Sequence, residues 1–284
     1  MSSISQEEQV AALPASIPRE PQAATNRIAA PPARVGGDFD YDSHGQGYAR
    51  VRRADARIAT MVHEALGSAW VVLNVGAGAG SYEPLDRHVI AIEPSLTMRA
   101  QRPANHVPAI SAMAEELPLD DKSVDASMAL VTVHQWAGLK KGLQELRRVT
   151  RGPVIVLTFD GDALHKFWLA DYAPELIAAE RRRYPSLTSI SELLGSSTRI
   201  LTVPIPRDCR DGFTEAFYAR PEAFLDPGVR RAQSAWGFIS EAEQAGSVER
   251  LKADLSSGVW DAKYGTWREK PSFEGSMRLI VSQA

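Results

Sequence analysis

The sequence predicts an α/β protein with a doubly wound, mostly parallel sheet of seven strands. From residue 70 onward, short apolar runs rich in Val and Ile alternate with segments of helical periodicity. This alternation is typical of parallel strands joined by right-handed crossovers, with helices on both faces of the sheet. The first apolar run leads into a loop with glycines at positions 76, 78 and 80. Ligands of open α/β sheets bind at such strand exits, so we expect a functional site at this loop.

The composition narrows the classes of function. Hydrophobic residues make up 44% and charged residues 24% of the 284 residues, the balance of a globular chain. The net charge of −3 gives no field that would gather nucleic acid or an anionic membrane. The single cysteine, Cys209, excludes an intrachain disulfide, and the six histidines show no metal-ligand spacing. No apolar run reaches the length of about 20 residues that spans a bilayer. We expect a cytoplasmic protein without metal, nucleic-acid or membrane partners, and both monomer and homodimer remain open.

The chain is expected to form one domain after a tail. Residues 1–36 are rich in Pro, Ala, Ser and Gln and have few large apolar residues, which predicts a disordered tail. Residues 37–284 form the domain and begin with a cap over 37–69. In this cap, apolar residues at helical spacing predict a helix over 50–66 that ends at Gly67. The polar face of this helix carries Arg50, Arg52, Arg53 and Arg57, which we interpret as a solvated face.

The rest of the domain divides into a core and two helical insertions. The core, residues 70–160, has a helix beginning near Pro94 and another over 139–149 that ends before Gly152 and Pro153. Segments 161–196 and 206–272 have helical patterns and many aromatic residues, which predicts a lid over the substrate. The segments 198–205 and 276–282 supply the last two strands of the same sheet. The seven predicted strands cover residues 71–75, 88–92, 107–110, 124–133, 154–157, 199–205 and 277–281.

The glycine loop and a later acid predict a cofactor that contains a nucleoside. Alternating glycines let the backbone approach a ligand closely. The dinucleotide pattern Gly-x-Gly-x-x-Gly is broken, because Ser81 stands where its third glycine belongs. Glu93 ends the second strand, 17 residues after Gly76. Its carboxylate suits the two hydroxyl donors of a ribose.

Four segments resemble the Rossmann-like class I S-adenosylmethionine-dependent methyltransferases, in particular their ubiquinone/menaquinone-biosynthesis-like group. Residues 72–80 resemble the glycine-rich first motif of that family, and residues 89–95 resemble its ribose-binding second motif. Residues 114–120 with 123–125 resemble the block after the third strand, and residues 145–149 resemble the helix before the fifth strand. The resemblance implies S-adenosyl-L-methionine as cofactor, S-adenosyl-L-homocysteine as product, and methyl transfer to an O, N or C atom of a small organic molecule.

The resemblance also implies the residues that bind the cofactor. The glycines would lie against its methionine portion, Glu93 would hold the ribose hydroxyls, and the backbone N–H of Ala114 would bond the adenine edge. Two positions depart from the family, since Asn74 and Met113 stand where the family usually has acids. The candidate cofactor-binding residues are Asn74, Gly76, Ala77, Gly78, Gly80, Glu93, Pro94, Met98, Ala114, Glu115 and Val131.

Chemistry is expected where the fourth strand ends. His134 is the candidate general base, because its ordinary pKa near 6.5 suits proton transfer around neutrality. The alternative is a histidine that only orders its loop or a water. Trp136 either walls the substrate pocket or packs in the core, and a catalytic role for Cys209 is the less favoured interpretation. The candidate substrate-binding residues are Tyr41, His44, Tyr48, Trp136, Asp160, Asp208 and Phe213.

Two other functions stay open at this stage. The departures at Asn74 and Met113 are compatible with a cofactor-binding regulatory or scaffold protein without transferase activity. A nicotinamide oxidoreductase is the other alternative, and Ser81 argues against it because it breaks the dinucleotide pattern.

Overall fold

The computed structural model describes the chain except for residues 1–38, 41, 43–44, 46–47, 196 and 284. The predicted tail over 1–36 lies outside the described residues, as do the candidate substrate residues Tyr41 and His44. Tyr48 is described as part of a helix, without its side chain.

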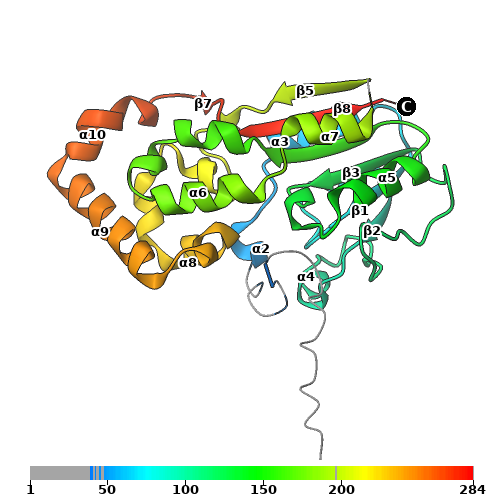
Figure 1. Ribbon diagram of the computed structural model, residues 1–284, viewed down its shortest axis with the longest axis horizontal. Helices are drawn as coiled ribbons and strands as arrows, with labels where there is room; N and C mark the ends of the chain where they lie inside the picture. Colours follow the sequence, from blue (N-terminus) through cyan, green and yellow to red (C-terminus); the bar gives the residue numbers. More distant parts are fainter. Residues whose placement is uncertain (1–38, 41, 43–44, 46–47, 196, 284) are drawn as a thin grey trace, which may run out of the picture. The chain divides into compact units, whose positions relative to one another are not determined.

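A six-stranded sheet forms the core, with the strand order β2-β1-β3-β4-β8-β5 (Figure 1). The four strands from β2 to β4 are parallel, whereas β8 runs antiparallel to both β4 and β5. The doubly wound, mostly parallel sheet is therefore confirmed. Its strands are β1 (Val71–Val75), β2 (His88–Ile92), β3 (Ala126–Leu130), β4 (Val154–Phe159), β5 (Thr198–Thr202) and β8 (Met277–Ser282).

The sheet has one strand fewer than predicted. The apolar run at 107–110 forms only an isolated bridge between Ile110 and Ile92. Pro108 lacks the N–H that a ladder needs, and Val107 and Ile110 remain exposed. The predicted strand 199–205 is also split, because Ile205 leaves the sheet. It belongs to a separate two-stranded sheet of β6 (Ile205–Pro206) and β7 (Ser272–Phe273).

In the described residues of the cap, two helices stand in place of the single helix predicted over 50–66. These are α2 (Tyr48–Val51) and α3 (Ala56–Ala65). The side chain of Asp55 accepts a hydrogen bond from the backbone N–H of Arg57, which caps α3 and starts a new helix there. Gly67 follows the last helical turn with a φ of 59°, as its predicted place at the helix end requires. Pro94 precedes α4 (Leu96–Ala100) instead of lying within it, because Ser95 is the N-cap.

Helices cover both faces of the sheet, and alternate strand residues point to opposite faces. One face packs α3 and the helical segments after β4, through residues such as Val72, Met128 and Ile155. The other face packs α5 (Leu139–Val149) and α7 (Leu187–Leu194), through residues such as Leu73 and Val156. The other α-helices are α6 (Pro174–Arg183), α8 (Pro227–Arg231), α9 (Glu241–Ser257) and α10 (Val259–Tyr264). Short 3₁₀ helices are η1 (Val133–Gln135), η2 (Gly161–Lys166), η3 (Trp168–Asp171), η4 (Thr214–Phe217), η5 (Pro221–Leu225), η6 (Ser234–Phe238) and η7 (Gly265–Arg268).

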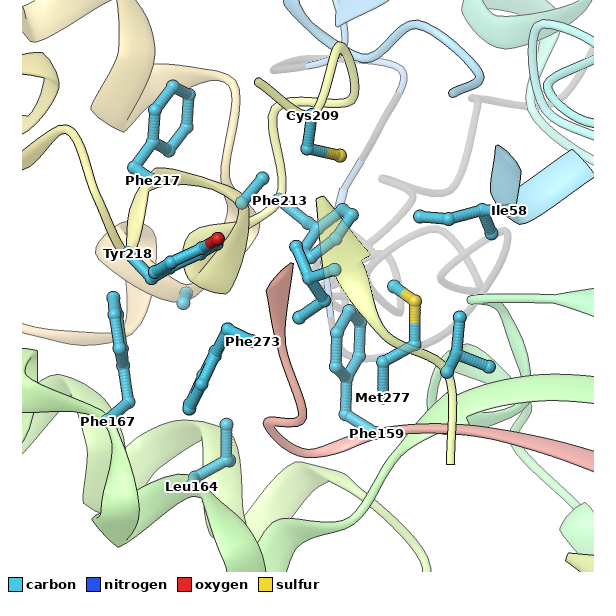
Figure 2. Packing of buried hydrophobic residues seen from close by; sticks show 14 of the residues in the cluster. Ile58, Phe159, Leu164, Phe167, Cys209, Phe213, Phe217, Tyr218, Phe273 and Met277 are labelled. Atoms are coloured by element: carbon cyan, nitrogen blue, oxygen red, sulfur yellow. The ribbon is translucent and has the colours of Figure 1, made fainter. Parts of the chain in front are cut away.

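The segments predicted as a helical lid have an aromatic core of their own. Trp168 packs edge-on against Trp260 with ring centres 5.4 Å apart. Its indole N–H also donates to the carbonyl oxygen of Tyr218 at 2.8 Å. Figure 2 shows another part of the same buried cluster, which includes Phe167, Phe273 and, at the end of β4, Phe159. The helical region is therefore packed against the sheet at the carboxyl end of β4.

Two features are absent from the described part of the chain. No helix in that part combines the length and the apolar character needed to cross a membrane. Likewise, the described His, Cys, Asp and Glu side chains form no group of three that could hold a metal ion.

Candidate active site

The main cavity opens where β1, β2 and β3 end, and it encloses about 920 Å³ when counted out to its mouth. Ten of the eleven candidate cofactor-binding residues line it, and so does Trp136. The lining residues are Asn74, Gly76, Ala77, Gly78, Ala79, Ser81, Glu93, Pro94, Ser95, Met98, Ala112, Met113, Ala114, Glu115, Leu130, Val131, Thr132, Gln135 and Trp136.

The glycines of the loop have two different roles. Gly76 has a φ of 69°, and a Cβ there would lie 2.0 Å from the Oγ1 of Thr132. Only glycine fits between the loop and the end of β3. Gly80, in contrast, is not among the residues that line the cavity, and its contact with the cofactor stays a prediction. Its φ is 91° and a Cβ would meet the ring of His106 at 2.7 Å, which shows that Gly80 serves the turn.

Glu93 is held rigidly at the tip of β2. Its Oε2 accepts a hydrogen bond from the backbone N–H of Gly78 at 2.8 Å, and its Oε1 accepts one from Ser95 at 2.9 Å. The side chain is buried, and burial raises the pKa of its carboxyl group. Each oxygen retains a lone pair for another donor. The carboxylate is therefore fixed in place with acceptor capacity left over.

Asn74 reveals an acid that the sequence analysis missed. The Nδ2 of Asn74 donates to Oε1 of Glu83 at 2.9 Å, and Arg102 pairs with the other oxygen of Glu83 at 2.7 Å. Asn74 lines the cavity, and its Oδ1 is buried without a hydrogen-bond partner among the described residues. A buried acceptor without a donor is costly, so this atom suits a ligand that brings a donor.

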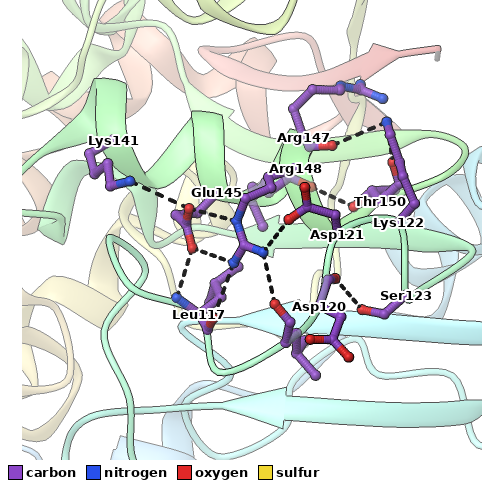
Figure 3. Close-up of polar contacts among 12 residues, drawn as sticks. Leu117, Asp120, Asp121, Lys122, Ser123, Lys141, Glu145, Arg147, Arg148 and Thr150 are labelled. Carbon is purple, nitrogen blue, oxygen red and sulfur yellow. Dashed lines mark hydrogen bonds and ion pairs between the residues drawn. The ribbon is translucent and has the colours of Figure 1, made fainter.

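A buried carboxylate fixes the wall of the cavity around Ala114 and Glu115. The Oε2 of Glu145 accepts from the backbone N–H of Leu117 at 3.0 Å and pairs with Arg148 at 2.7 Å (Figure 3). These hydrogen bonds lower the pKa of Glu145 to about 2, with Arg148 contributing most. Glu115 in turn accepts from the N–H of Gly138 at 2.8 Å, which ties the wall to the start of α5.

A second cavity adjoins the first, and Val131 lines both. Val131 has a φ of 54°, a strained conformation for a β-branched residue. The second cavity encloses about 450 Å³ counted to its mouth. Besides Val131, it contains two of the predicted site residues, His134 and Phe213. Its lining residues are Arg52, Val131, His134, Phe159, Leu164, Glu180, Tyr184, Phe213, Thr214, Glu215, Gln233 and Ser234.

His134 lines the second cavity as a half-buried side chain, and its ring centre lies 4.8 Å from that of Tyr184. Burial lowers the pKa of His134 well below 6.5, and the positive charges of Arg183 and Arg52 lower it further. The imidazole is therefore neutral at neutral pH. Its Nε2 lies 2.9 Å from the side-chain nitrogen of Gln135, so one ring nitrogen interacts with this amide.

Two predicted substrate residues do not line either cavity. Asp160 caps η2 by accepting from the N–H of Asp162, and it pairs with Arg278 at 3.5 Å. Asp208 is 80% exposed and pairs with Arg57 at 2.7 Å. Both aspartates follow strands, as predicted, but their carboxylates are engaged by neighbouring helices and arginines. The structure therefore places neither carboxylate at the two cavities, and their role in substrate binding stays a prediction.

Arg52 corrects the prediction of a solvated arginine face. Its side chain is only 11% exposed, its Nε donates to Asp211 at 2.6 Å, and it lines the second cavity. The break between α2 and α3 turns it inward, which a continuous helix over 50–66 could not do. Cys209 is buried, and burial raises the pKa of its thiol to about 12, so it stays protonated at neutral pH.

The sequence analysis also missed Glu180, Thr214, Glu215 and Gln233 of the second cavity. They come from α6, η4 and the segment before η6, which are far apart in the chain. Each has the appearance of an ordinary polar residue in a helical region, so no local signal marks it.

The fold and the main cavity define a class of protein before any comparison. A parallel sheet whose first strand runs into a glycine loop, with a buried acid at the tip of the second strand, is typical of α/β proteins that bind nucleoside-containing cofactors. The unpartnered acceptor of Asn74 and the fixed carboxylate of Glu93 fit such a ligand.

Comparisons with known proteins identify the family. The family model described as a methyltransferase domain matches residues 73–157. A solved structure described as a methyltransferase from an antibiotic biosynthesis pathway of Anabaena variabilis is 30% identical, with a TM-score of 0.77, and the match covers 82% of this chain and 99% of that chain. A methyltransferase dependent on S-adenosylmethionine, from Thermotoga maritima, shares the fold at 15% identity and a TM-score of 0.53, with 86% of this chain and 97% of that chain covered. A search of curated proteins finds no match.

The chain belongs to the class I S-adenosylmethionine-dependent methyltransferases. S-adenosylmethionine is the cofactor of this class. Membership in this family argues against the two alternatives, a non-enzymatic binding protein and a nicotinamide oxidoreductase. The ubiquinone/menaquinone-like group stays a prediction.

Proposed function

We propose that the protein transfers the methyl group of S-adenosylmethionine, held in the main cavity, to an O, N or C atom of a small organic molecule held in the second cavity. The observation that carries this proposal is the shared wall at Val131, which joins a cofactor-sized cavity to a smaller one lined by polar and aromatic side chains. The relative from Anabaena variabilis, described by its antibiotic biosynthesis pathway, supports a small organic substrate.

The residues of the main cavity have distinct roles in this proposal. Glu93 accepts hydrogen bonds from both ribose hydroxyls, because its oxygens are already oriented by Gly78 and Ser95. The Oδ1 of Asn74 accepts from the ammonium group of the methionine portion, which supplies the donor it lacks. Pro94 and Met98 border the adenine, and the N–H of Ala114 bonds its edge.

The cofactor, when bound, supplies a methyl group on a sulfonium leaving group. The chain then has to align the nucleophile, exclude water and accept a proton where the nucleophile carries one. His134 is neutral and lines the second cavity, so we assign it the proton-accepting role. Trp136 lines the main cavity and Phe213 lines the second cavity, so one ring bounds the substrate from each cavity.

Calorimetric titration with S-adenosylmethionine and S-adenosylhomocysteine tests the proposal first. Binding of both at one site, followed by a mass gain of one methyl group in a panel of small nucleophiles, is the expected result. A folded protein that binds neither compound would contradict the assignment of the main cavity. Binding without transfer to any small nucleophile would contradict the proposed substrate class and leave the assignment of the main cavity intact.

A further inference from the structure

The second cavity has one apolar side and one polar side. Aromatic rings form the apolar side: the ring centre of Phe159 lies 5.3 Å from that of Tyr184 and 5.5 Å from that of Phe213. Leu164 and Val131 extend this side. Flat rings and aliphatic groups bind well to such a surface, because aromatic side chains present large faces at low entropic cost.

Gln233 places a buried donor on the polar side. Its Oε1 accepts from the hydroxyl of Thr214 at 3.0 Å and from the indole N–H of Trp236 at 3.3 Å. An indole N–H donates only, so it fixes which end of the amide is the oxygen. The Nε2 of Gln233 has no hydrogen-bond partner in the described part of the chain, although the residue is 4% exposed. A donor kept buried in this way favours a ligand that brings an acceptor.

Glu180 places a buried acceptor on the same side. It is 6% exposed, and the contacts of its Oε1 are long: 3.4 Å to the hydroxyl of Tyr184 and 4.0 Å to Arg183. The Thr214 side chain, which donates to Gln233, also acts on the pKa of Glu180 and lowers it against the larger rise from burial, so both the carboxyl and the amide lie near Thr214. The other buried acid of the cavity, Glu215, is already engaged by the backbone and side chain of Ser276 at 2.7 to 3.1 Å.

A donor and an acceptor side by side select the chemistry of the ligand. An ammonium group would pair with Glu180 but would face the hydrogens of Gln233. A carboxylate would accept from Gln233 but would be repelled by Glu180, and Arg52, which also lines the cavity, is already paired with Asp211. A hydroxyl group accepts through its oxygen and donates through its hydrogen, so it satisfies both partners.

We propose that the second cavity recognises a hydroxyl group on a flat, uncharged ring, with Gln233 donating to the hydroxyl oxygen and Glu180 accepting its hydrogen. This inference rests on the proposed function, since it names the substrate class of the same site. Recognition of the hydroxyl is independent of which substrate atom receives the methyl group.

Four probes of similar size test the inference on the full chain saturated with S-adenosylhomocysteine. Phenol carries the hydroxyl, toluene lacks it, benzylamine is cationic and benzoate is anionic. Ligand-detected NMR titration gives their relative affinities. We expect phenol to bind at least about tenfold more tightly than each of the other three, the effect of satisfying one or two buried polar groups.

Variants test whether Gln233 produces the preference for phenol over toluene. Gln233→Leu should remove most of the advantage of phenol over toluene, whereas Gln144→Leu, on the exposed side of α5, should keep it. If Gln233→Leu does not fold, Gln233→Glu serves instead: it replaces the donor by an acceptor and should shift the preference from phenol toward benzylamine.

The inference is overturned if toluene, benzylamine or benzoate binds as tightly as phenol, if no probe binds, or if the preference for phenol survives at Gln233→Leu. These outcomes are distinct from failure of the proposed function, because they are recorded on protein that has bound S-adenosylhomocysteine. Failure to bind that compound is instead the result that contradicts the main cavity.

Discussion

The hydroxyl of Tyr82 donates a 2.8 Å hydrogen bond to Oδ2 of Asp211, joining residues 129 positions apart in the chain. Tyr82 lies just after the glycine loop and has a left-handed φ of 64°. The other oxygen of Asp211 accepts from Arg52, which lines the second cavity. One buried carboxylate thus connects the loop of the main cavity to the wall of the second.

Replacing Tyr82 by Phe tests this connection. The ring stays, but Asp211 loses one of its two donors while 2% exposed, so we expect the free energy of unfolding to fall by about 1 to 3 kcal/mol. Urea denaturation measures the change. Tyr264→Phe is the matched control, because Tyr264 donates to Asp171, whose side chain is 49% exposed. An equal loss in the two variants would contradict a special role for the buried contact.

Gly76→Ala should damage the cofactor site by a steric clash. The new Cβ would lie 2.0 Å from Thr132 and the residue would keep a positive φ, so the loop has to move. We expect the affinity for S-adenosylhomocysteine, measured by calorimetry, to fall at least about tenfold.

The matched control for this change is Gly67→Ala. Gly67 also has a positive φ, of 59°, but a Cβ there has no atom within 4 Å. It should lose about 1 kcal/mol of unfolding free energy from the backbone conformation alone and keep its cofactor affinity. If both variants bind the cofactor equally well, close approach of Gly76 to Thr132 is not what the loop requires.

Glu93 predicts a pH dependence of cofactor affinity. Burial raises the pKa of its carboxyl group, so protonation begins at higher pH than for an ordinary glutamate, and the protonated form loses acceptor capacity toward the ribose. Affinity for S-adenosylhomocysteine should therefore fall as pH decreases from neutrality through this raised pKa. Calorimetry across that interval gives the profile.

Glu93→Gln should lower the affinity by about 10- to 100-fold at neutral pH and remove this decline. The exposed Glu116→Gln should leave both the affinity and its profile unchanged. A variant at Glu93 that retains the wild-type profile would show that another group titrates.

Glu145 predicts a pH dependence of stability that arises from a pKa shift opposite to that of Glu93. Its pKa is lowered from 4.5 to about 2, mainly by Arg148, so the folded state favours the ionised form. This stabilisation is complete above the ordinary pKa and is lost as pH falls from about 4.5 toward about 2. The stability difference between wild type and Glu145→Gln, measured by urea denaturation at several pH values, should shrink over that interval. A constant difference would contradict the role of the ion pair in Figure 3.

The sequence predicted the cofactor side of the site far better than the substrate side. Gly76, Gly78 and Glu93 are recognisable because each lies at a fixed distance from an apolar strand, so local pattern and position coincide. Arg52 and Gln233 reach the second cavity only through packing of distant helices, which no periodicity encodes. The strand predicted at 107–110 and the single helix predicted over 50–66 were wrong for local reasons, the missing N–H of Pro108 and the capping side chain of Asp55.

His134 gives the most direct test of the chemistry. Because burial, Arg183 and Arg52 all lower its pKa, the imidazole is already neutral well below pH 6.5. With a nucleophile found in the methyl-transfer screen, kcat should therefore show no loss from histidine protonation between neutral pH and the ordinary histidine pKa. His134→Ala should lower kcat by about 10² to 10⁴-fold, the usual effect of removing a general base, and leave the affinity for S-adenosylhomocysteine unchanged.

The exposed His165→Ala is the matched control and should have wild-type kcat. A histidine that only orders its loop would give a different result: a lower unfolding temperature with kcat retained, because the reacting atoms would keep their proton acceptor. A third outcome is a decrease of kcat as pH falls through the ordinary histidine pKa, in wild type but not in His134→Ala. It would confirm a catalytic histidine but contradict its lowered pKa. The three measurements together separate proton transfer at His134 from a purely structural contribution.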